Sequence, residues 1–250
     1  MDNLNPLNFP ADLLACLRLA RAAAALTGAG VSAESGVPTF RDAQTGLWAR
    51  YRPEDLASPQ AFAENPVQVW EWYRWRRGLV SGALPNPAHY ALADLEKRIP
   101  RFTLITQNVD GLHHTAGSRQ VIELHGNIWR NKCSRDGAQV EVVSSNQENP
   151  PLCPRCSGLV RPDVVWFGEQ LPAEALEAAW DAAQHCAVFL SIGTSGLVQP
   201  AASLPLIAVQ SGATLIEINP DETPLTPHAS YSLRGPAGLI LPELLQAVWG

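Results

Sequence analysis

The sequence predicts an α/β fold in which a parallel sheet carries helices on both faces and a smaller module is inserted into the chain. Apolar runs of strand length alternate with helical segments, which is typical of parallel sheets. Each of these runs ends in a polar or glycine-containing turn. Residues 131–160 depart from this pattern, since they hold three cysteines, several polar residues and Pro150-Pro151. Ligands of such sheets bind at the carboxyl ends of the strands, so the turns are the expected place for functional residues.

The individual elements follow from hydrophobic periodicity and from turn-forming residues. In the first half of the chain they are a helix within 9–25, a strand at Ala23–Leu26, an aromatic-rich helical block at 60–80, a helix at 86–98 that begins with Asn86 and Pro87, and a strand at Phe102–Thr106. In the second half they are the inserted module at 131–160, a helix at 172–184, a strand at Ala187–Ile192, a helix at 199–210, a strand at Thr214–Ile218 and a helix at 241–248.

The composition disfavours several classes of function. Of the 250 residues, 46% are hydrophobic and 17% are charged, which indicates a globular chain. The net charge of −6 disfavours nucleic acid as a ligand, because no basic excess is available to neutralise phosphates. No apolar stretch approaches the ~18 residues of a membrane span. Residues 1–10 lack the basic start and apolar run of a secretory signal, and the number of cysteines, five, is odd. We therefore expect a cytoplasmic protein without a disulfide framework.

A glycine-rich turn, Gly28–Ala33, follows the first strand and reads GAGVSA. It fits the dinucleotide pattern G-x-G-x-x-G/A, in which glycines allow a tight turn and exposed amides hold a pyrophosphate. The pattern alone is a weak signal, because a hydride-transferring dehydrogenase or a turn without a ligand would explain it equally well. The acidic residue that usually follows about 20 residues later is not evident either, since Glu54 does not end a strand.

A longer string begins at the same turn, where Gly28–Arg41 reads GAGVSAESGVPTFR. Further motifs follow, namely TQNVDGLH at Thr106–His113, ELHG at Glu123–Gly126, RPDVVWFGE at Arg161–Glu169, GTS at Gly193–Ser195 and INP at Ile218–Pro220. In this order they resemble the motifs of the sirtuins (the Sir2 family), the NAD-dependent protein deacylases. The resemblance covers roughly residues 10–248.

The resemblance implies a single catalytic domain over 1–250, with a Rossmann-like parallel sheet and a smaller helical and zinc-ribbon-like module. The Rossmann-like part is expected at about 9–38, 86–126 and 162–250. The small module is expected at about 39–85, which is helical and holds a cofactor loop, and at about 127–161, which is zinc-ribbon-like.

The resemblance also implies the reaction, in which NAD is a co-substrate. Nicotinamide leaves, and the acyl group of a modified lysine passes to the ribose to give O-acyl-ADP-ribose. His125 matches the family's general base on the ribose hydroxyls, a task that suits an imidazole titrating near neutral pH. Asn108 matches a catalytic position in the nicotinamide pocket, and Asp110 lies beside it. His113 and His114 are competing candidates to which we assign structural or loop roles.

The positions that match NAD contacts in the family are spread along the chain. Gly193–Ser195 match a phosphate- and ribose-contacting loop, Asn219 matches the adenosine-ribose contact, and Ala237 lies where the family closes the adenine pocket. An aromatic ring at Phe40 can shield the reactive ribose from water, and Arg41 can pair with phosphate. The full set is Gly28, Ala29, Gly30, Ser32, Ala33, Thr39, Phe40, Arg41, Trp48, Gln107, Asn108, Asp110, Gly193, Thr194, Ser195, Asn219 and Ala237.

The expected partner is an acyl-lysine protein bound as an extended peptide, with no nucleic acid and no membrane. Val165, Phe167, Gly168 and Glu169 resemble the strand that pairs with this peptide by β-augmentation. The sequence does not define the oligomeric state, and a monomer is compatible with it.

Tyr73 and Arg76 bear on the acyl group. They match the Tyr-x-x-Arg of the sirtuin subclass (class III) that prefers acidic acyl groups, and their spacing places both side chains on one helix face. An arginine binds a terminal carboxylate bidentately, and a tyrosine hydroxyl adds a hydrogen bond. Desuccinylase and demalonylase activity is therefore expected beside deacetylase activity. The alternative is an amphipathic helix with a solvated arginine and a packed tyrosine.

A structural zinc site is suggested by the cysteines of the inserted module. The family usually has two Cys-x-x-Cys pairs, and here the second pair, Cys153 and Cys156, is complete. The first pair has Cys133 but Asp136 in place of its second cysteine. Zinc accepts a carboxylate oxygen, so a site of three cysteines and Asp136 is one reading, and a degenerate site that binds zinc weakly or not at all is the other.

Two other functions are weighed against deacylation. A mono-ADP-ribosyltransferase would divert the activated ribose to another nucleophile, but it would not need His125 to activate the ribose hydroxyls. A non-catalytic NAD-sensing module would keep the glycine turn without needing Asn108, Asp110 and His125 together. The presence of all three favours the deacylase.

Overall fold

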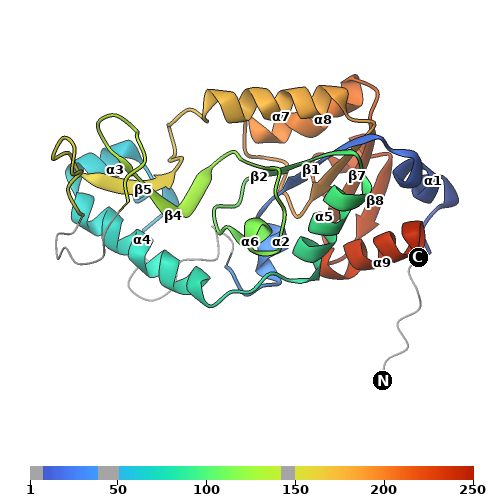
Figure 1. The fold of residues 1–250 in the computed structure, drawn as a ribbon, viewed down its shortest axis with the longest axis horizontal. Coiled ribbons are helices and arrows are strands. Elements are labelled where there is room, and N and C mark those ends of the chain that lie inside the picture. Colours follow the sequence, from blue (N-terminus) through green and yellow to red (C-terminus); the bar gives the residue numbers. More distant parts are fainter. Residues whose placement is uncertain (1–7, 39–50, 142–149) are drawn as a thin grey trace.

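The computed structural model describes residues 8–38, 51–141 and 150–250, and its centre is a parallel six-stranded sheet (Figure 1). The strand order is β3-β2-β1-β6-β7-β8, which is the order of the dinucleotide-binding Rossmann sheet. The fold class predicted from the sequence is confirmed. The strands are β1 (Ala22–Thr27), β2 (Arg101–Thr106), β3 (Val121–Glu123), β6 (Val188–Ile192), β7 (Thr214–Asn219) and β8 (Tyr231–Arg234).

Helices cover both faces of the sheet because the strands bury side chains on both sides. Ala23 and Ala25 of β1 pack into the cluster formed with α1, α5 and α9, whereas Ala24 and Leu26 pack into the cluster formed with α7 and α8 (Figure 1). The bounds of these helices are α1 (Ala11–Leu19), α5 (Pro87–Arg98), α7 (Ala173–His185), α8 (Leu204–Gln210) and α9 (Ala237–Trp249).

The first helix is shorter than its alanine-rich sequence predicts. It ends at Leu19 rather than continuing toward residue 25, and all of Ala22–Thr27 is strand. This strand is buried throughout and pairs with β2 on one side and β6 on the other. Its place in the middle of the sheet outweighs the helix propensity of alanine, which is worth only a few tenths of a kcal/mol per residue.

A smaller module lies at the end of the molecule opposite α1 (Figure 1). It contains an antiparallel pair, β4 (Gly126–Cys133) and β5 (Val160–Val164), together with α3 (Pro59–Glu64) and α4 (Pro66–Ser81). The helical block predicted at 60–80 is thus two helices, because Asn65 caps α4 with its side chain and Pro66 occupies its first turn. Residues 131–141 and 150–160 form the outer loops of this pair, and we name them the cysteine module.

Other differences from the prediction are confined to short or edge elements. The strands β3, β4, β5 and β8 were not predicted, and the segment predicted as a helix at 199–210 contains a 3-10 turn at Ala201–Ser203 before α8. Two short helices, α2 (Ala29–Ala33) and α6 (Leu112–Thr115), follow the turns after β1 and β2. Within the described residues, no helix is long and apolar enough to cross a membrane.

Candidate active site

The turns after β1 and β6 meet at the point where the strand order reverses, which is where ligands of this fold bind. The Gly28 amide donates to the Ile192 carbonyl at 3.1 Å, and the Gly30 amide donates to the Gly193 carbonyl at 3.0 Å. A Cβ atom on Gly28 would lie 2.7 Å from the Gly193 oxygen, and one on Gly30 would lie 2.8 Å from the Gly193 Cα. Any side chain at these positions would force the two backbones apart, so the glycines are required by packing.

The turn after β2 is joined to this glycine turn by hydrogen bonds. The Asn108 side-chain amide donates to the Gly28 carbonyl and to Ser32 Oγ, both at 3.0 Å. Ser32 Oγ in turn donates to Asp110 Oδ2 at 2.7 Å, and the other Asp110 oxygen accepts from the Leu112 amide at 2.8 Å. Asn108, Asp110 and Ser32 are all buried. The network fixes three of the predicted NAD-binding side chains before any ligand is present.

His125 lies directly before β4, next to the turn after β2. Its Nδ1 atom is 3.0 Å from the Gln107 carbonyl, which can only accept, so Nδ1 carries the proton. In the neutral ring the lone pair is therefore on Nε2. Burial lowers the pKa of His125, and the hydrogen bond to Gln107 offsets part of that shift. The ring is thus held as a neutral base in a fixed tautomer.

His113 and His89 form a second pair of histidines, buried behind the turn after β2. Their ring centroids are 4.8 Å apart, and His113 Nε2 lies 2.9 Å from Thr27 Oγ1. Burial lowers the pKa of His89 to about 4 and that of His113 to about 3. Both rings are neutral and lie within the protein, whereas His114 is half-exposed near Glu123.

The turns after β6 and β7 complete the carboxyl edge of the sheet. The Asn219 amide donates to the Thr194 carbonyl at 2.8 Å, and Thr194 Oγ1 lies 3.0 Å from Ser191 Oγ. Ser195 is exposed, and Ala237 is buried in the first turn of α9. We name these turns, with 28–33, 107–111 and His125, the carboxyl edge. The predicted residues Ala29, Ala33 and Gln107 also lie on it, whereas Thr39, Phe40, Arg41 and Trp48 lie outside the described residues.

Residues 165–169, expected to pair with a peptide, lie just beyond β5 rather than within it. The Val165 amide donates to the His125 carbonyl at 2.9 Å, and the Phe167 amide donates to the Ala57 carbonyl at 2.9 Å. The Phe167 side chain is exposed, and Gly168 has a positive φ of 86°.

The Glu169 carboxylate is used within the protein. It accepts hydrogen bonds from Arg161 and, at 2.9 Å, from the Trp166 amide. The Arg161 guanidinium in turn lies 3.2 Å from the centroid of the Trp166 ring. Glu169 therefore anchors the segment, and the prediction that it also contacts substrate stays a prediction.

Tyr73 and Arg76 lie on the buried face of α4, next to this segment. Trp166 Nε1 donates to the Tyr73 hydroxyl at 2.9 Å, and Tyr73 packs with Ala57, Val109 and Trp166 in one cluster. Burial raises the pKa of Tyr73 to about 12. The Arg76 guanidinium lies 5.1 Å from the Trp72 ring centroid, and burial lowers its pKa while Tyr73 raises it. The solvated arginine of the alternative reading is wrong, since Arg76 is only 9% exposed.

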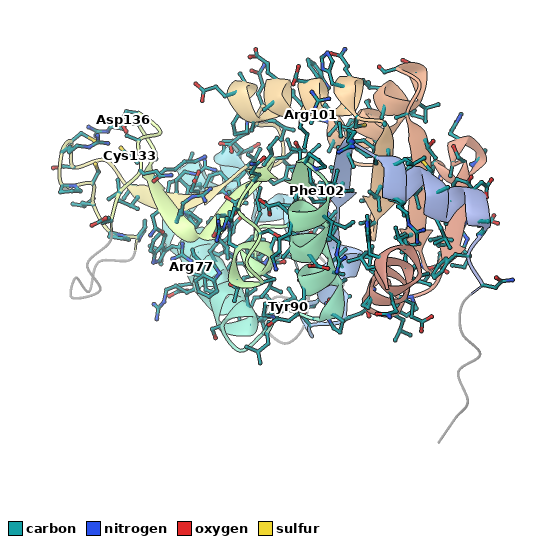
Figure 2. The ribbon with its side chains drawn as sticks, turned by 45° about the vertical axis from the view of Figure 1, so that its right-hand side comes forward. Arg77, Tyr90, Arg101, Phe102, Cys133 and Asp136 are labelled. Atoms are coloured by element: carbon teal, nitrogen blue, oxygen red, sulfur yellow. The ribbon has the colours of Figure 1, made fainter. Side chains whose placement is uncertain are left out.

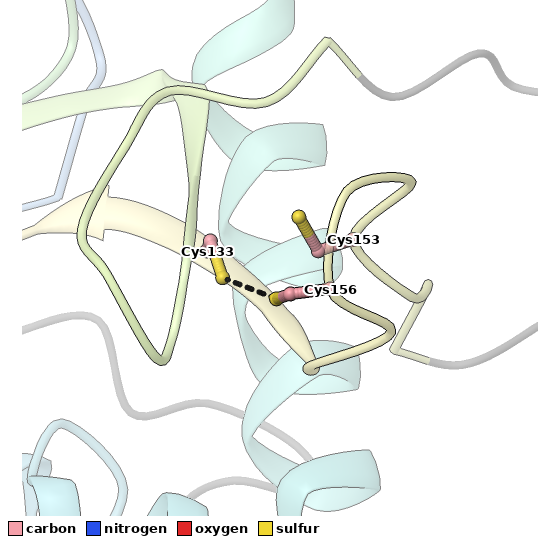
Figure 3. A group of neighbouring side chains, drawn as sticks. All are labelled: Cys133, Cys153 and Cys156. Carbon is pink, nitrogen blue, oxygen red and sulfur yellow. Dashed lines mark hydrogen bonds between the residues drawn. The ribbon is translucent and has the colours of Figure 1, made fainter.

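The cysteine module gathers three of its four predicted metal ligands. The sulfur atoms of Cys133, Cys153 and Cys156 all lie within 4.8 Å of one another, and those of Cys133 and Cys156 are 3.5 Å apart (Figure 3). Thiolates are the ligands of structural zinc, so this donor set fits the metal. Asp136 is exposed in the same outer loop as Cys133 (Figure 2), where its carboxylate pairs with Arg155 at 3.2 Å and accepts from the Ala138 amide at 3.0 Å.

Asn86, which the sequence indicates only as the start of a helix, also contacts residues at and after the glycine turn. The Asn86 side chain donates to the Val31 carbonyl at 2.7 Å and to Ser35 Oγ at 3.0 Å, so it joins α5 to the helix after the glycine turn. Its sequence signal, an asparagine before a proline, indicates the cap but not a contact with residues more than 50 positions away.

Comparison with known proteins agrees with this geometry. Residues 28–200 match the sequence profile described as the Sir2 family. This chain belongs to the Sir2 family. It is 52% identical over 250 residues to the "NAD-dependent protein deacylase" of Methylococcus capsulatus, covering 97% of this chain and 98% of that one. It is 56% identical over 225 residues to "NAD-dependent protein deacylase 1" of Archaeoglobus fulgidus, covering 90% of this chain and 91% of that one.

Solved structures of Sir2 proteins have the same fold. A Sir2 homologue in complex with NAD superimposes with a TM-score of 0.89 at 53% identity, covering 96% of this chain and 94% of that one. A Sir2 homologue variant in complex with 2′-O-acetyl ADP ribose has a TM-score of 0.87 at 54% identity, with 96% of each chain covered. A Sir2 protein bound to an acetylated peptide has a TM-score of 0.85 at 33% identity, covering 94% of this chain and 97% of that one.

Proposed function

We propose that this chain is an NAD-dependent protein-lysine deacylase that releases nicotinamide and O-acyl-ADP-ribose. The observation that carries the proposal is the grouping of three polar side chains at one edge, where Asn108 and Asp110 bond to the glycine turn and His125 bonds to the neighbouring turn at Gln107. A protein that only bound NAD would need the turn but not this set of polar side chains. The deacylase names of the relatives and the NAD, acetyl ADP-ribose and acetylated-peptide complexes of Sir2 structures support the same conclusion.

When bound, NAD would supply the nicotinamide leaving group and the ribose that receives the acyl group. The backbone of the glycine turn and of residues 193–195 would hold the phosphates, because side chains are excluded there and amides can face the ligand. Asn108 and Asp110 would orient the nicotinamide end. Since Ser32 and the Gly28 carbonyl already hold them, little side-chain entropy is lost on binding.

His125 would act as the general base on the ribose hydroxyls. Its Nδ1 proton is committed to the Gln107 carbonyl, so Nε2 is the atom that accepts a proton. The depressed pKa keeps the ring unprotonated and ready to accept at neutral pH.

The acyl-lysine would approach between residues 165–169 and the turn after β2, where His125 and Val165 are joined through the backbone. Recognition of an extended peptide by backbone pairing would make the enzyme tolerant of sequence around the lysine. Tyr73 and Arg76 would form the far end of the acyl pocket, and acidic acyl groups such as succinyl, malonyl or glutaryl would be accepted beside acetyl. Because the Tyr73 hydroxyl accepts from Trp166, its own proton is available for the acyl carboxylate.

The decisive experiment incubates the protein with NAD and matched acetyl-, succinyl- and malonyl-lysine peptides, followed by mass spectrometry. We expect deacylated peptide, nicotinamide and O-acyl-ADP-ribose in equal amounts. Nicotinamide release with ADP-ribose attached to protein and acyl groups retained would indicate ADP-ribosyl transfer. Binding of NAD without any turnover would indicate an NAD-sensing module.

Acyl preference is tested with Arg76→Met, using Arg74→Met as the matched control. Arg74 is exposed on the opposite face of α4, so its loss removes a charge without touching the pocket. We expect Arg76→Met to lower kcat/KM for the succinyl peptide by about 10²-fold, since a charge-assisted hydrogen bond to a carboxylate is worth roughly 1.5–3 kcal/mol. Deacetylation should change far less. Equal losses on the two peptides would contradict the acidic-acyl pocket.

We propose that zinc occupies the cysteine module with a structural role, because the three thiols converge and none of the catalytic side chains lies there. Elemental analysis of the purified protein should give close to one zinc per chain. A content below about one-tenth of an equivalent would contradict the proposal, since structural sites are nearly full.

A further inference from the structure

Glu217 is a carboxylate buried within the parallel sheet, two residues before Asn219 at the end of β7. Only 2% of its surface is exposed, and burial of a charged group is costly unless hydrogen bonds replace the lost water. It is not part of the deacylation chemistry proposed above.

Four partners surround this carboxylate, and all come from the chain that follows it. Three are the hydroxyl groups of Thr223, Thr226 and Ser232, which donate to the Glu217 oxygens at 2.5, 2.7 and 3.1 Å respectively. The fourth is the Arg234 guanidinium at 3.4 Å. Thr223 and Thr226 belong to the connection between β7 and β8, and Ser232 and Arg234 belong to β8, so Glu217 ties both the connection and the next strand to β7.

The hydroxyls require an acceptor at this position. Thr223 Oγ1 already accepts from the Leu225 amide at 3.1 Å, and Thr226 Oγ1 accepts from the Thr223 amide at 2.9 Å and from Arg234 at 3.1 Å. Their protons are thus directed to Glu217. A carboxylate has only acceptors, whereas an amide of the same shape would turn two N–H donors toward groups that are themselves donating.

The connection held in this way forms part of the carboxyl edge. Gly196, directly after the Gly193–Ser195 turn, faces it closely, since a Cβ atom there would lie 3.7 Å from Thr223 Oγ1 and 3.8 Å from Pro224 Cδ. Directly after β8, the Gly235 amide donates to the Asn219 carbonyl at 3.3 Å, and the Asn219 side chain donates to the Thr194 carbonyl. These contacts support the 193–195 loop and Asn219, which match the family's phosphate- and ribose-contacting loop and its adenosine-ribose contact.

We propose that Glu217 is a positioning residue for the adenosine half of NAD. Through Thr223 and Thr226 it sets the shape of the wall behind Gly196 and Asn219, without contacting the reacting atoms. The inference rests on the proposed use of NAD. The proposal predicts separate effects on NAD affinity and on catalysis, because Asn108 and Asp110 are held by Ser32, and His125 by the Gln107 carbonyl. None of these hydrogen bonds involves Glu217.

The test compares Glu217→Gln with Leu13→Ala. The control removes a fully buried side chain of α1 that packs on the same sheet, so it destabilises the protein without touching the connection. The dissociation constant for ADP-ribose is measured by calorimetry, and kcat and both KM values are measured with an acetyl-lysine peptide. We expect Glu217→Gln to raise the ADP-ribose Kd and the KM for NAD roughly tenfold, as the loss of buried hydrogen bonds predicts. Its kcat and its KM for the peptide should stay within about twofold of wild type, as should all constants of Leu13→Ala.

If Glu217→Gln does not fold, Thr223→Val, which removes one of the hydroxyl groups, is used in its place. A raised KM for NAD with an unchanged kcat in this variant would support the proposal. ADP-ribose affinity that is unchanged in the folded variant, or lowered equally in Leu13→Ala, would overturn the positioning role. Failure of the wild-type protein to bind ADP-ribose would instead overturn the proposed function itself.

Discussion

The carboxyl edge and the cysteine module hold their side chains by different means. At the edge, Asn108, Ser32 and Asp110 are buried, bond to one another and to backbone, and rest on two apolar layers of the sheet. In the cysteine module, three thiols face one another, and the nearby Asp136–Arg155 pair is about half exposed, where ion pairs are worth little. The edge is held by its own hydrogen bonds, whereas the module has a small buried cluster and three thiols that the proposed zinc would join. Mutations at the edge should therefore affect chemistry directly, and those in the module only through stability.

The largest effect is expected at His125. His125→Ala should lower the turnover of an acetyl-lysine peptide by about 10²–10⁴-fold, the usual contribution of a general base. ADP-ribose affinity should stay within about threefold, because the phosphate-binding turns are unchanged. His114→Ala is the matched control, since this half-exposed histidine lies 3.5 Å from Glu123, two residues before His125. A His125→Ala variant that retains wild-type turnover would show that the edge does not supply the base.

The second largest effect is expected at Gly193. A Cβ atom there would lie 2.6 Å from the Val31 amide nitrogen, and φ is +60°. Gly212 also has a positive φ, +92°, but its Cβ would meet no atom within 4 Å. Gly212→Ala should cost only the backbone strain, about 1 kcal/mol of unfolding free energy, while Gly193→Ala should cost at least about 3 kcal/mol and weaken ADP-ribose binding more than tenfold. Equal losses in urea denaturation would contradict the importance of the contact between the turns.

The third prediction concerns the pH dependence of stability. It applies to the carboxyl edge and not to the cysteine module, because residues 126–184, which include that module, contain no histidine. In the unfolded chain His89 and His113 take up protons as the pH falls through about 6.5. In the folded protein burial keeps them neutral down to about pH 4 and 3 respectively. The unfolded state therefore binds more protons in this range, and stability should fall as the pH is lowered from about 6.5 toward 4, by a few kcal/mol in total. His113→Phe should flatten this dependence, as measured by denaturant titrations at each pH.

The smallest effect on activity is expected from Asp136→Cys, which supplies a fourth thiol in the outer loop beside Cys133. We expect tighter zinc binding, measured by competition with a chromophoric chelator, and a higher melting temperature of the zinc-loaded protein. The kcat should change by less than about twofold, because the loop lies away from the catalytic side chains. A large change in kcat without a change in zinc affinity would mean that the module takes a direct part in the reaction.

The sequence predicted those parts of the fold that are encoded locally. A strand followed by a glycine or polar turn is a short-range pattern, and it correctly located β1, β2, β6 and β7 and the turns that end them. The α1 boundary was missed because alanine favours helix, while the pairing that overrides it comes from strands far along the chain. The edge strands β3 and β8 are too short, at three and four residues, to show a period.

The same division applies to the candidate site. Motifs identified Asn108, Asp110 and His125, but no local pattern could indicate that Ser32 joins two of them or that Asn86 bonds to Val31. The Asp136–Arg155 pair was also beyond sequence reasoning, since it depends on how two loops of the module face each other.

The contact between the turns at Gly28, Gly30 and Gly193 has a mechanical consequence. The sheet consists of two halves, β3-β2-β1 and β6-β7-β8, and these turns form the seam between them. Because backbone meets backbone there, with two hydrogen bonds and no side chains to slide past, the seam resists shear. The two halves of the sheet are therefore joined at the site by backbone as well as by the β1–β6 pairing. On the side of the small module, His125 comes directly before β4 and its carbonyl accepts from the Val165 amide, so any displacement of β4 or of residues 165–169 would be transmitted to the His125 ring.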